Sequence, residues 1–525
     1  MTFLDWSIIA IYMGGLVGLS FYWGRDQVDQ DDYYVADRGM PWWASAISIM
    51  ATQTSAISFI SVPAFVALKE GGGLTWLQYE LAIPLAMIGV MVFIIPIFYD
   101  LRLVSVYEYL EGRYGPSART LVSAIFLLSR GLATGVSIYA TAIVLSVVLK
   151  IPLGTTILII GAVTIAYDFI GGITAVIYSD VIQMGILLTG LIVCVWFAAE
   201  KAGGLTDMIA TFPVERLNAA EFNAGFNGKA ETPFWAFLFG GLFLYISYYG
   251  ADQSQVQREL AVGSVTDAKK SLLLNGLARF PLTLLYVLLG IAALSVYQQS
   301  PQLASMVPPG NPDYLIPQYI ALILPAGLRA LLFAALLAAA MSSIDSAINS
   351  LSAATVRDFT NKWKQGSENN LYWGKVTTAI WGVLVTGFAF IVENISGTVI
   401  EAINKIGSAF YGPILAAFLA GIISKKVRTG GIIRGLIVGV AFNLFLWIVL
   451  PAVHWMWWNL LGCIVAFAMA YLFSIIAKQG KAPDDKYMLS LNKIIKREKD
   501  WKGIYILLGA YFLLILAVII LLSLL

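Results

Sequence analysis

The sequence has little of what a soluble enzyme needs. Only 12% of its residues are charged, its formal net charge is +2, and it has two cysteines, Cys194 and Cys463, and one histidine, His454. Two cysteines inside apolar stretches argue against a disulfide framework or a cysteine-based metal site, and one histidine cannot build a histidine-ligated site. The small charge gives no indication of a nucleic-acid partner, and no polar stretch is long enough for a soluble enzymatic domain. We therefore expect neither an enzyme nor a nucleic-acid-binding protein.

What the sequence has instead is apolar length. Hydrophobic residues make up 59% of the 525 residues, and stretches of ~20 apolar residues, the length that crosses a bilayer as a helix, recur along the chain. We predict an all-α polytopic membrane protein with fourteen transmembrane helices and lipid around them. The predicted spans are 3–23, 42–67, 75–99, 118–149, 153–172, 173–200, 233–251, 271–298, 326–356, 373–393, 396–423, 430–451, 454–477 and 503–525. The first lacks the basic front end and cleavage site of a signal peptide, so we expect it to be retained.

The basic residues are distributed unevenly between the predicted loops. With the N-terminus outside, the inward loops carry 24 of the 33 Lys and Arg residues, and the outward loops carry five. Because cytoplasmic loops are enriched in Lys and Arg, this distribution predicts that both ends face outward. The basic linker from Lys478 to Trp501 is then cytoplasmic.

Two predicted spans contain dense runs of small and polar residues. One run extends from Ala51 to Ser58 in the second span, and the other from Tyr245 to Gln253 in the seventh span. An unpaired backbone group in lipid costs several kcal/mol, so a helix break survives there only around a cavity or an ion. Two such breaks, each in the first helix of a five-span block, indicate inverted repeats with a midplane site. The alternative is ordinary packing of Ser and Thr between helices.

The ninth span carries a polar face. Ser342, Asp345 and Ser346 are spaced i, i+3, i+4 and share one side of a helix. Their oxygens are hard ligands that suit a hard cation. A membrane-embedded aspartate costs at least ~2.5 kcal/mol unless it is paired, which makes Asp345 a functional residue by default and Asp180 a second one. Packing between helices is the alternative explanation for the serines.

A second polar set lies on the third and eleventh spans. It contains Gln78 and Glu80 on one span and Glu401, Asn404 and Lys405 on the other. Glu401 and Lys405 could pair at i, i+4, and Glu80 could lie at the outer interface. Arg130 on the fourth span either extends toward the membrane surface or faces a cavity.

Among membrane-protein classes, a secondary transporter fits best. A channel would need a ring or repeated filter of polar residues, which the sequence does not contain. A primary pump would need a nucleotide-binding domain, and no Gly-rich phosphate loop ending in Lys-Ser/Thr occurs. An intramembrane enzyme would need a His/Asp metal pair or a Ser-His pair, and there is a single histidine.

An ordered set of motifs resembles the sodium:solute symporter family. The motifs are Asp32-Tyr33-Tyr34-Val35-Ala36-Asp37-Arg38-Gly39-Met40-Pro41-Trp42-Trp43, Val106-Tyr107-Glu108-Tyr109-Leu110-Glu111, Tyr178-Ser179-Asp180-Val181-Ile182-Gln183, Tyr249-Gly250-Ala251-Asp252-Gln253 with Val256-Gln257-Arg258, and Ser342-Ser343. The resemblance implies a single transporter domain over 1–525 with a five-plus-five inverted-repeat core. Its first repeat is 42–200 and its second is 233–423; helix 3–23 precedes them and three helices in 430–525 follow. We expect a bacterial inner (plasma) membrane location.

The same resemblance implies where sodium binds. The first site lies between the second and ninth spans, with ligands at the backbone carbonyls of Ala51, Thr54 and Ala339 and the hydroxyls of Ser342 and Ser343. A second sodium site, implied by the sialic acid transporters of the family, would use Asp180, Ser342, Asp345 and Ser346. Asp345 departs from the serine usual there. Either a second sodium ion binds at this position or Asp345 accepts a proton, which would make the protein proton-coupled.

The implied substrate is a small polar solute. Glu80 matches a sugar-contacting glutamate of the galactose-transporting branch, and Asn404 falls where that branch has a glutamine. On these two residues we expect a sugar or polyol. Other motifs resemble the monocarboxylate, vitamin and iodide branch or the sialic acid branch, so a small organic anion is the alternative. The residues predicted to line one midplane substrate cavity are Ser55, Ser58, Gln78, Glu80, Tyr248 and Asn404, with Tyr248 or Tyr249 as the inner gate.

Overall fold

The structure, a computed structural model, describes residues 2–24, 35–54, 56–103, 105–168, 173–360, 370–392, 398–481 and 484–524. The longer elements of the first half are α1 (Phe3–Gly24), α3 (Trp42–Gln53), α4 (Ala56–Ala67), η2 (Leu74–Glu80), α5 (Ile83–Gly89), η3 (Val90–Ile94), α6 (Ile95–Asp100), α7 (Val106–Tyr114), α8 (Pro116–Leu149), α9 (Leu153–Asp168), α10 (Ile173–Ala202) and α11 (Leu205–Ala210). Those of the second half are η5 (Ala236–Gly240), α12 (Gly241–Ala251), α13 (Gln253–Leu260), α14 (Val265–Gln299), α15 (Pro301–Met306), α16 (Leu315–Ile323), α17 (Leu328–Thr355), η7 (Val356–Thr360), α18 (Asn370–Val392), α19 (Val399–Ile423), α20 (Thr429–Val449), α21 (Trp457–Ala477), α22 (Leu491–Glu498) and α23 (Lys502–Leu522). The short 3-10 turns are η1 (Ala36–Arg38), η4 (Val214–Arg216), η6 (Pro312–Tyr314), η9 (Asp485–Tyr487) and η10 (Lys499–Trp501).

The described residues include nine helices long and apolar enough to cross a membrane, and one bent helix pair adds a tenth. The nine are Leu74–Asp100, Pro116–Leu149, Ile173–Ala202, Val265–Gln299, Leu328–Thr355, Val399–Ile423, Thr429–Val449, Trp457–Ala477 and Ile494–Leu522. Four shorter apolar helices, Phe3–Gly15, Leu153–Ile165, Ala236–Ala251 and Val376–Val392, lie where the sequence predicts the other four spans. The all-helical membrane fold is therefore confirmed, while fourteen crossings stay a prediction.

The first broken helix consists of α3 and α4. Helix α3 ends at Gln53, α4 begins at Ala56, and the two are bent by 52°. Thr54 has φ −97° and ψ 66°, outside the helical region, although its N–H still donates to the Met50 carbonyl at 2.8 Å. The sequence places a break within the small, polar run from Ala51 to Ser58, and the structure places it inside that run.

The second interruption is narrower and lies at the end of its predicted run. Tyr245 to Ala251 remain helical in α12, and Asp252 is the single extended residue, with φ −86° and ψ 120°, before α13 begins at Gln253. Asp252 also caps α13, because its Oδ1 accepts from the Ser254 N–H at 2.8 Å. Aspartate favours this position, since its side chain satisfies a backbone N–H that has no partner within the helix.

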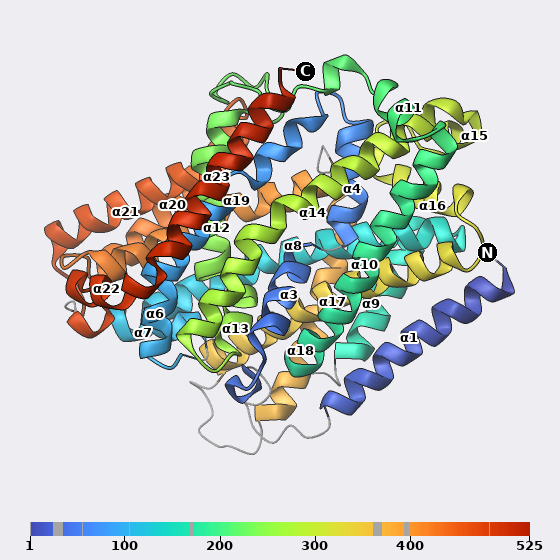
Figure 1. The fold of residues 1–525 in the computed structure, drawn as a ribbon. Helices are drawn as coiled ribbons and strands as arrows, with labels where there is room; N and C mark the ends of the chain where they lie inside the picture. Colours follow the sequence, from blue (N-terminus) through green and yellow to red (C-terminus); the bar gives the residue numbers. More distant parts are fainter. Residues whose placement is uncertain are drawn as a thin grey trace.

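The two interrupted helices pack against several other helices of the assembly (Figure 1). Helix α3 contacts α10, α14 and α17, while α12 contacts α5 and α19. Every residue of α4 is buried, so this half-helix belongs to the protein interior. Figure 1 shows α1 and the α20–α21 pair at opposite edges of the molecule.

Helices α20 and α21 pack backbone to backbone. A Cβ placed on Gly435 of α20 would lie 2.5 Å from the Ala466 carbonyl oxygen, and one on Gly439 would lie 2.6 Å from the Ala466 Cβ. Small residues let membrane helices approach this closely. Helix α20 is therefore held against α21 by close backbone contact at these glycines, and Trp447 of α20 also packs against Trp458 of α21.

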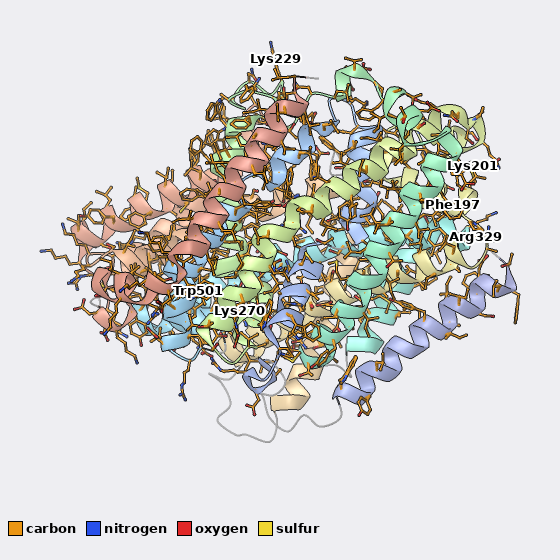
Figure 2. All side chains as sticks on the ribbon, in the orientation of Figure 1. Phe197, Lys201, Lys229, Lys270, Arg329 and Trp501 are labelled. Atoms are coloured by element: carbon orange, nitrogen blue, oxygen red, sulfur yellow. The ribbon has the colours of Figure 1, made fainter. Side chains whose placement is uncertain are left out.

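Basic side chains mark two ends of the helix assembly. Lys201 and Lys229, which the sequence places in outward loops, lie in Figure 2 toward the side where Figure 1 marks both termini. Lys270 and Trp501, which the sequence places inward, lie toward the other side. This arrangement agrees with the predicted loop assignment of these four residues.

Candidate functional site

A cavity of about 100 Å³ lies beside the first interruption and is also lined by Leu244 and Tyr248 of α12. Its wall combines residues of α3, α4, η2, α8, α12, α14, α17 and α19. Four of the predicted substrate residues, Ser58, Glu80, Tyr248 and Asn404, line it, and so does Ser343 of the predicted sodium site. The sequence thus brings these five residues, from five separate elements, to one cavity; their roles stay predictions.

The remaining two predicted substrate residues differ. Ser55 lies outside the described residues. Gln78 is fully buried but does not line the cavity, because its Nε2 donates to the carbonyls of Thr75 at 3.2 Å and Thr232 at 2.9 Å. The amide nitrogen of Gln78 therefore fastens η2 to the segment before η5, and a substrate contact of Gln78 stays a prediction.

Glu80 is paired with an arginine that sequence reasoning missed. Its Oε1 accepts from Arg279 Nη2 at 2.9 Å and from Thr283 Oγ1 at 3.0 Å, whereas its Oε2 has no hydrogen-bond partner. Arg279 also donates to Thr54 Oγ1. An ionisable residue inside a predicted span is a functional hypothesis by default, and that rule, applied to span 271–298, could have identified Arg279.

Aromatic residues cover the Asn404 side of the cavity. The Tyr79 hydroxyl donates to Asn404 Oδ1 at 2.7 Å, and the Tyr245 hydroxyl donates to the Tyr79 carbonyl at 3.0 Å. Tyr79 stacks on Trp76 with ring centroids 5.0 Å apart. These contacts join η2 to α19 and α12 next to the cavity.

Arg130 of α8 contributes a second guanidinium to the cavity wall. Its Nη1 lies 3.8 Å from Asp252 Oδ2, too far for a hydrogen bond, and its buried Nε has no partner. Of the two alternatives that the sequence left open for Arg130, the structure selects the cavity.

The predicted sodium ligands lie on two helices that touch each other. Ala51 and Thr54 stand at the end of α3, Ala339 and Ser343 stand on α17, and α3 contacts α17. The break frees carbonyls at the end of α3 from helical hydrogen bonding, and the Ser343 hydroxyl donates to the Ala339 carbonyl at 3.1 Å. Hard, neutral oxygens of this kind fit a monovalent hard cation. Ser342 occupies α17, but its side chain is outside the description.

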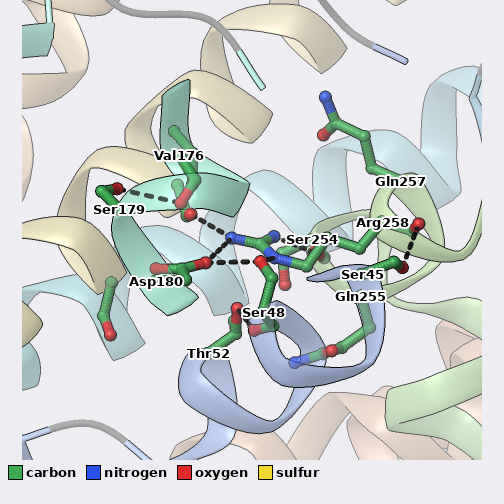
Figure 3. Close-up of polar contacts among 12 residues, drawn as sticks. Ser45, Ser48, Thr52, Val176, Ser179, Asp180, Ser254, Gln255, Gln257 and Arg258 are labelled. Atoms are coloured by element: carbon green, nitrogen blue, oxygen red, sulfur yellow. Dashed lines mark hydrogen bonds and ion pairs between the residues drawn. The ribbon is translucent and has the colours of Figure 1, made fainter. Parts of the chain in front are cut away.

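The predicted second ion site contains a buried arginine (Figure 3). Arg258 of α13 donates from Nη2 to Asp180 Oδ2 at 3.3 Å and to Ser346 Oγ, and from Nε to Ser48 Oγ at 2.7 Å. Ser48 in turn donates to Asp180 Oδ2 at 2.5 Å. A second sodium ion would therefore share Asp180 and Ser346 with this guanidinium. Asp345 is buried on the same helix as Ser346.

The two predicted gate tyrosines have different surroundings. Tyr248 lines the cavity and accepts from Gln255 Nε2 at 2.7 Å. Tyr249 is fully buried, packs edge to face against Tyr248, and donates to Gln53 Oε1. Tyr249 thereby links α12 directly to the end of α3.

Comparison with known proteins gives the family. The sequence model of the sodium:solute symporter family matches residues 33–439. The sodium/sialic acid symporter NanT of Aliivibrio fischeri is 27% identical over 93% of this chain and 96% of its own length. Sodium-coupled monocarboxylate transporter 1 of Xenopus laevis is 30% identical over 85% of this chain and 72% of its own length.

A solved structure agrees with the sequence comparison. A substrate-bound, outward-open sodium-coupled sialic acid symporter, described as revealing a novel sodium site, superposes with a TM-score of 0.80 at 25% identity, covering 92% of this chain and 99% of that one. Sodium is the ion that the family and these relatives name, so the alternative of proton coupling finds no support. The chain belongs to the sodium:solute symporter family and is a sodium-coupled solute symporter.

Proposed function

We propose that this symporter imports a small hydroxylated carboxylate together with sodium. The observation that carries the proposal is Arg130, a guanidinium in the cavity wall whose nearest counter-charge is 3.8 Å away and whose Nε has no partner. Arginine presents a planar fork of donors that matches a carboxylate in two parallel hydrogen bonds. The other cavity arginine, Arg279, is already paired with Glu80 at 2.9 Å.

The size of the cavity favours a solute of few atoms. Its volume of about 100 Å³ leaves room for a small solute. A short monocarboxylate fits this space, while a larger sugar acid would require a wider state of the cavity. Glu80 Oε2, buried without a partner, supplies an acceptor for a hydroxyl of the solute.

Sodium binding at the end of α3 provides the coupling in this proposal. The carbonyls of Ala51, Thr54 and Ala339 and the hydroxyls of Ser342 and Ser343 hold the ion. Ser343 lines the same cavity as Arg130, so ion and solute would lie in one continuous polar region. An ion shifts a conformational equilibrium only by its differential affinity for the two states. Sodium would therefore stabilise the state in which the break of α3 faces α17.

We further propose fourteen membrane crossings around a five-plus-five inverted-repeat core, with both termini facing the outside of an inner (plasma) membrane. The support for this count is that the nine long helices, the bent pair and the four shorter apolar helices fall at the fourteen predicted spans. The two interrupted helices, α3–α4 and α12–α13, stand first in the two proposed repeats.

Uptake into proteoliposomes tests the proposal. We would compare L-lactate, its amide and D-glucose under an inward sodium gradient, an inward pH gradient without sodium, and no gradient. The expected result is sodium-driven uptake of lactate, weak uptake of the amide, and loss of lactate uptake in Arg130→Gln. Uptake of the amide equal to that of lactate, or full lactate uptake by Arg130→Gln, would refute the anion assignment.

The second candidate is a neutral sugar or polyol, the substrate that the sequence favours. Glu80 Oε2 and the nearby Asn404 are the groups that would bind its hydroxyls. In the same assay this candidate predicts sodium-driven glucose uptake that survives in Arg130→Gln and is lost in Glu80→Gln.

A further inference from the structure

The counter-ion of Arg130 is also the hinge residue of the second interrupted helix. Asp252 is the one extended residue between α12 and α13. Its Oδ1 accepts from the Ser254 N–H at 2.8 Å and from Ser254 Oγ at 2.7 Å, so this oxygen is committed to capping α13. Its Oδ2 accepts no hydrogen bond and faces Arg130 at 3.8 Å.

This pair is incomplete although both groups are removed from solvent. The Asp252 side chain is 2% exposed and the Arg130 side chain is 11% exposed. At 3.8 Å the attraction is Coulombic only, whereas a charge-assisted hydrogen bond would bring nitrogen and oxygen to about 2.8 Å. Arg130 also shares a hydrogen bond with the Tyr248 side chain, but a buried ion pair held this loosely retains much of its desolvation cost, so a solute carboxylate has free energy to gain at Arg130.

Such an acceptor can approach only from the cavity. Arg130 lines the cavity, whereas Asp252 is not among the lining residues. A solute carboxylate would therefore reach the guanidinium without contacting Asp252. The two carboxylates then compete for one arginine, and only the solute is positioned to form two hydrogen bonds with it.

We propose that Asp252 is a built-in competitor that the solute carboxylate displaces from Arg130, and that this displacement releases the hinge between α12 and α13. The inference rests on the proposed function, because it needs a solute with a negative charge. Hinge residues at element ends absorb backbone rotation during such transitions. While Arg130 attracts Asp252, the hinge is tethered to α8; when the solute takes Arg130, the tether is lost.

The other end of α13 indicates what the hinge would move. Arg258 stands six residues after Asp252 and is hydrogen-bonded to Ser48 of α3, Asp180 of α10 and Ser346 of α17. Helix α13 thus connects the hinge at Asp252 with the buried hydrogen-bond cluster around Arg258. Rotation at Asp252 would therefore turn Arg258 relative to α3, the helix whose end carries predicted sodium ligands.

The test removes the charge of Asp252 and keeps the cap. Asp252→Asn retains a side-chain oxygen for the Ser254 N–H, and Asp252→Ser, a second N-cap residue, serves if the first variant is poorly folded. We expect lactate affinity at saturating sodium to rise about tenfold, equivalent to one unit in log Kd. The amide should bind as in the unmodified protein, and the maximal uptake rate should fall while KM falls with it.

Ser254→Ala is the matched control. It removes one hydrogen bond of Asp252 at the same hinge without changing any charge, so the ratio of acid to amide affinity should stay constant. Unchanged lactate affinity in both Asp252 variants, with lactate binding still lost in Arg130→Gln, would overturn the displacement while leaving the proposed substrate intact. Lactate binding that is insensitive to Arg130→Gln would instead overturn the proposed substrate itself.

Discussion

Arg279 of α14 donates a hydrogen bond to Thr54, the residue at which α3 departs from helical geometry. The same guanidinium donates to Glu80 in the cavity at 2.9 Å. One side chain therefore connects the break in α3, which carries proposed sodium ligands, with Glu80, which is proposed to contact the solute. A change at either end can reach the other through two hydrogen bonds.

Glu80→Gln should weaken the binding of both sodium and the solute. Without the carboxylate, the buried Arg279 keeps an uncompensated positive charge next to Thr54, which repels sodium and lowers its affinity. We expect the sodium Kd, measured without solute by calorimetry, to rise about tenfold, which is about 1.4 kcal/mol.

The double variant Glu80→Gln/Arg279→Gln removes both charges and should recover part of the sodium affinity. Thr283→Val is the control, since it deletes only the neutral hydrogen bond to Glu80 Oε1 and should change the sodium Kd little. Equal sodium affinity in the unmodified protein and in Glu80→Gln would contradict the electrostatic link.

Ser343→Ala should remove one proposed sodium ligand. We expect sodium affinity to fall by about 1–2 kcal/mol, as for the loss of one buried polar partner, while solute affinity at saturating sodium changes less. By thermodynamic reciprocity, sodium and solute must tighten each other's binding by the same factor. Titrating each ligand at fixed levels of the other measures this factor, and a larger loss for solute than for sodium would place Ser343 in the solute site instead.

Asp180→Ala should strongly destabilise the protein. Arg258, 1% exposed, would lose its carboxylate acceptor, and removal of one partner of a buried ion pair costs about 3–5 kcal/mol. Thermal denaturation in detergent measures the loss. Ser179→Ala, which deletes a hydroxyl bonded only to the nearby Val176 carbonyl in Figure 3, is the matched control and should lower the midpoint far less. Equal midpoints for the two variants would show that the pair contributes little.

The proposed orientation can be tested by cysteine labelling, because both native cysteines are buried. Met488→Cys, in the basic linker, should stay unlabelled by an impermeant maleimide added outside intact cells and become labelled after permeabilisation. Lys229→Cys should be labelled in both conditions. The reverse pattern would invert the topology.

Much of the cavity was predictable from the sequence because its polar residues interrupt apolar spans. The run from Ala51 to Ser58 indicates a break, since small polar residues do not otherwise crowd the middle of a lipid-facing helix. Glu80, Tyr248 and Asn404 are likewise polar residues within predicted apolar spans, and all three line one cavity in the structure. The position of the second interruption was less predictable, because most of its polar run, Tyr245 to Ala251, is helical and only Asp252 is extended.

The pairing of charges was not predictable. Glu80 and Arg279 are separated by 199 positions, and Arg258 and Asp180 by 78, so no local pattern joins them. Arg258 lies between the predicted spans 233–251 and 271–298, in a predicted inward loop where a basic residue needs no partner. Its burial follows from the packing of α13 against α3, α14 and α17, which is a tertiary property.

The backbone contact between α20 and α21 has a use in measuring the transport cycle. Gly435 and Gly439 bring the backbones of these two helices into contact, and Trp447 of α20 packs against Trp458 of α21. We therefore expect the α20–α21 pair to move as one unit. Spin labels on its exposed face, at Ile448 for example, would let distances to labels near α3 or α13 report the displacement of those elements relative to this unit.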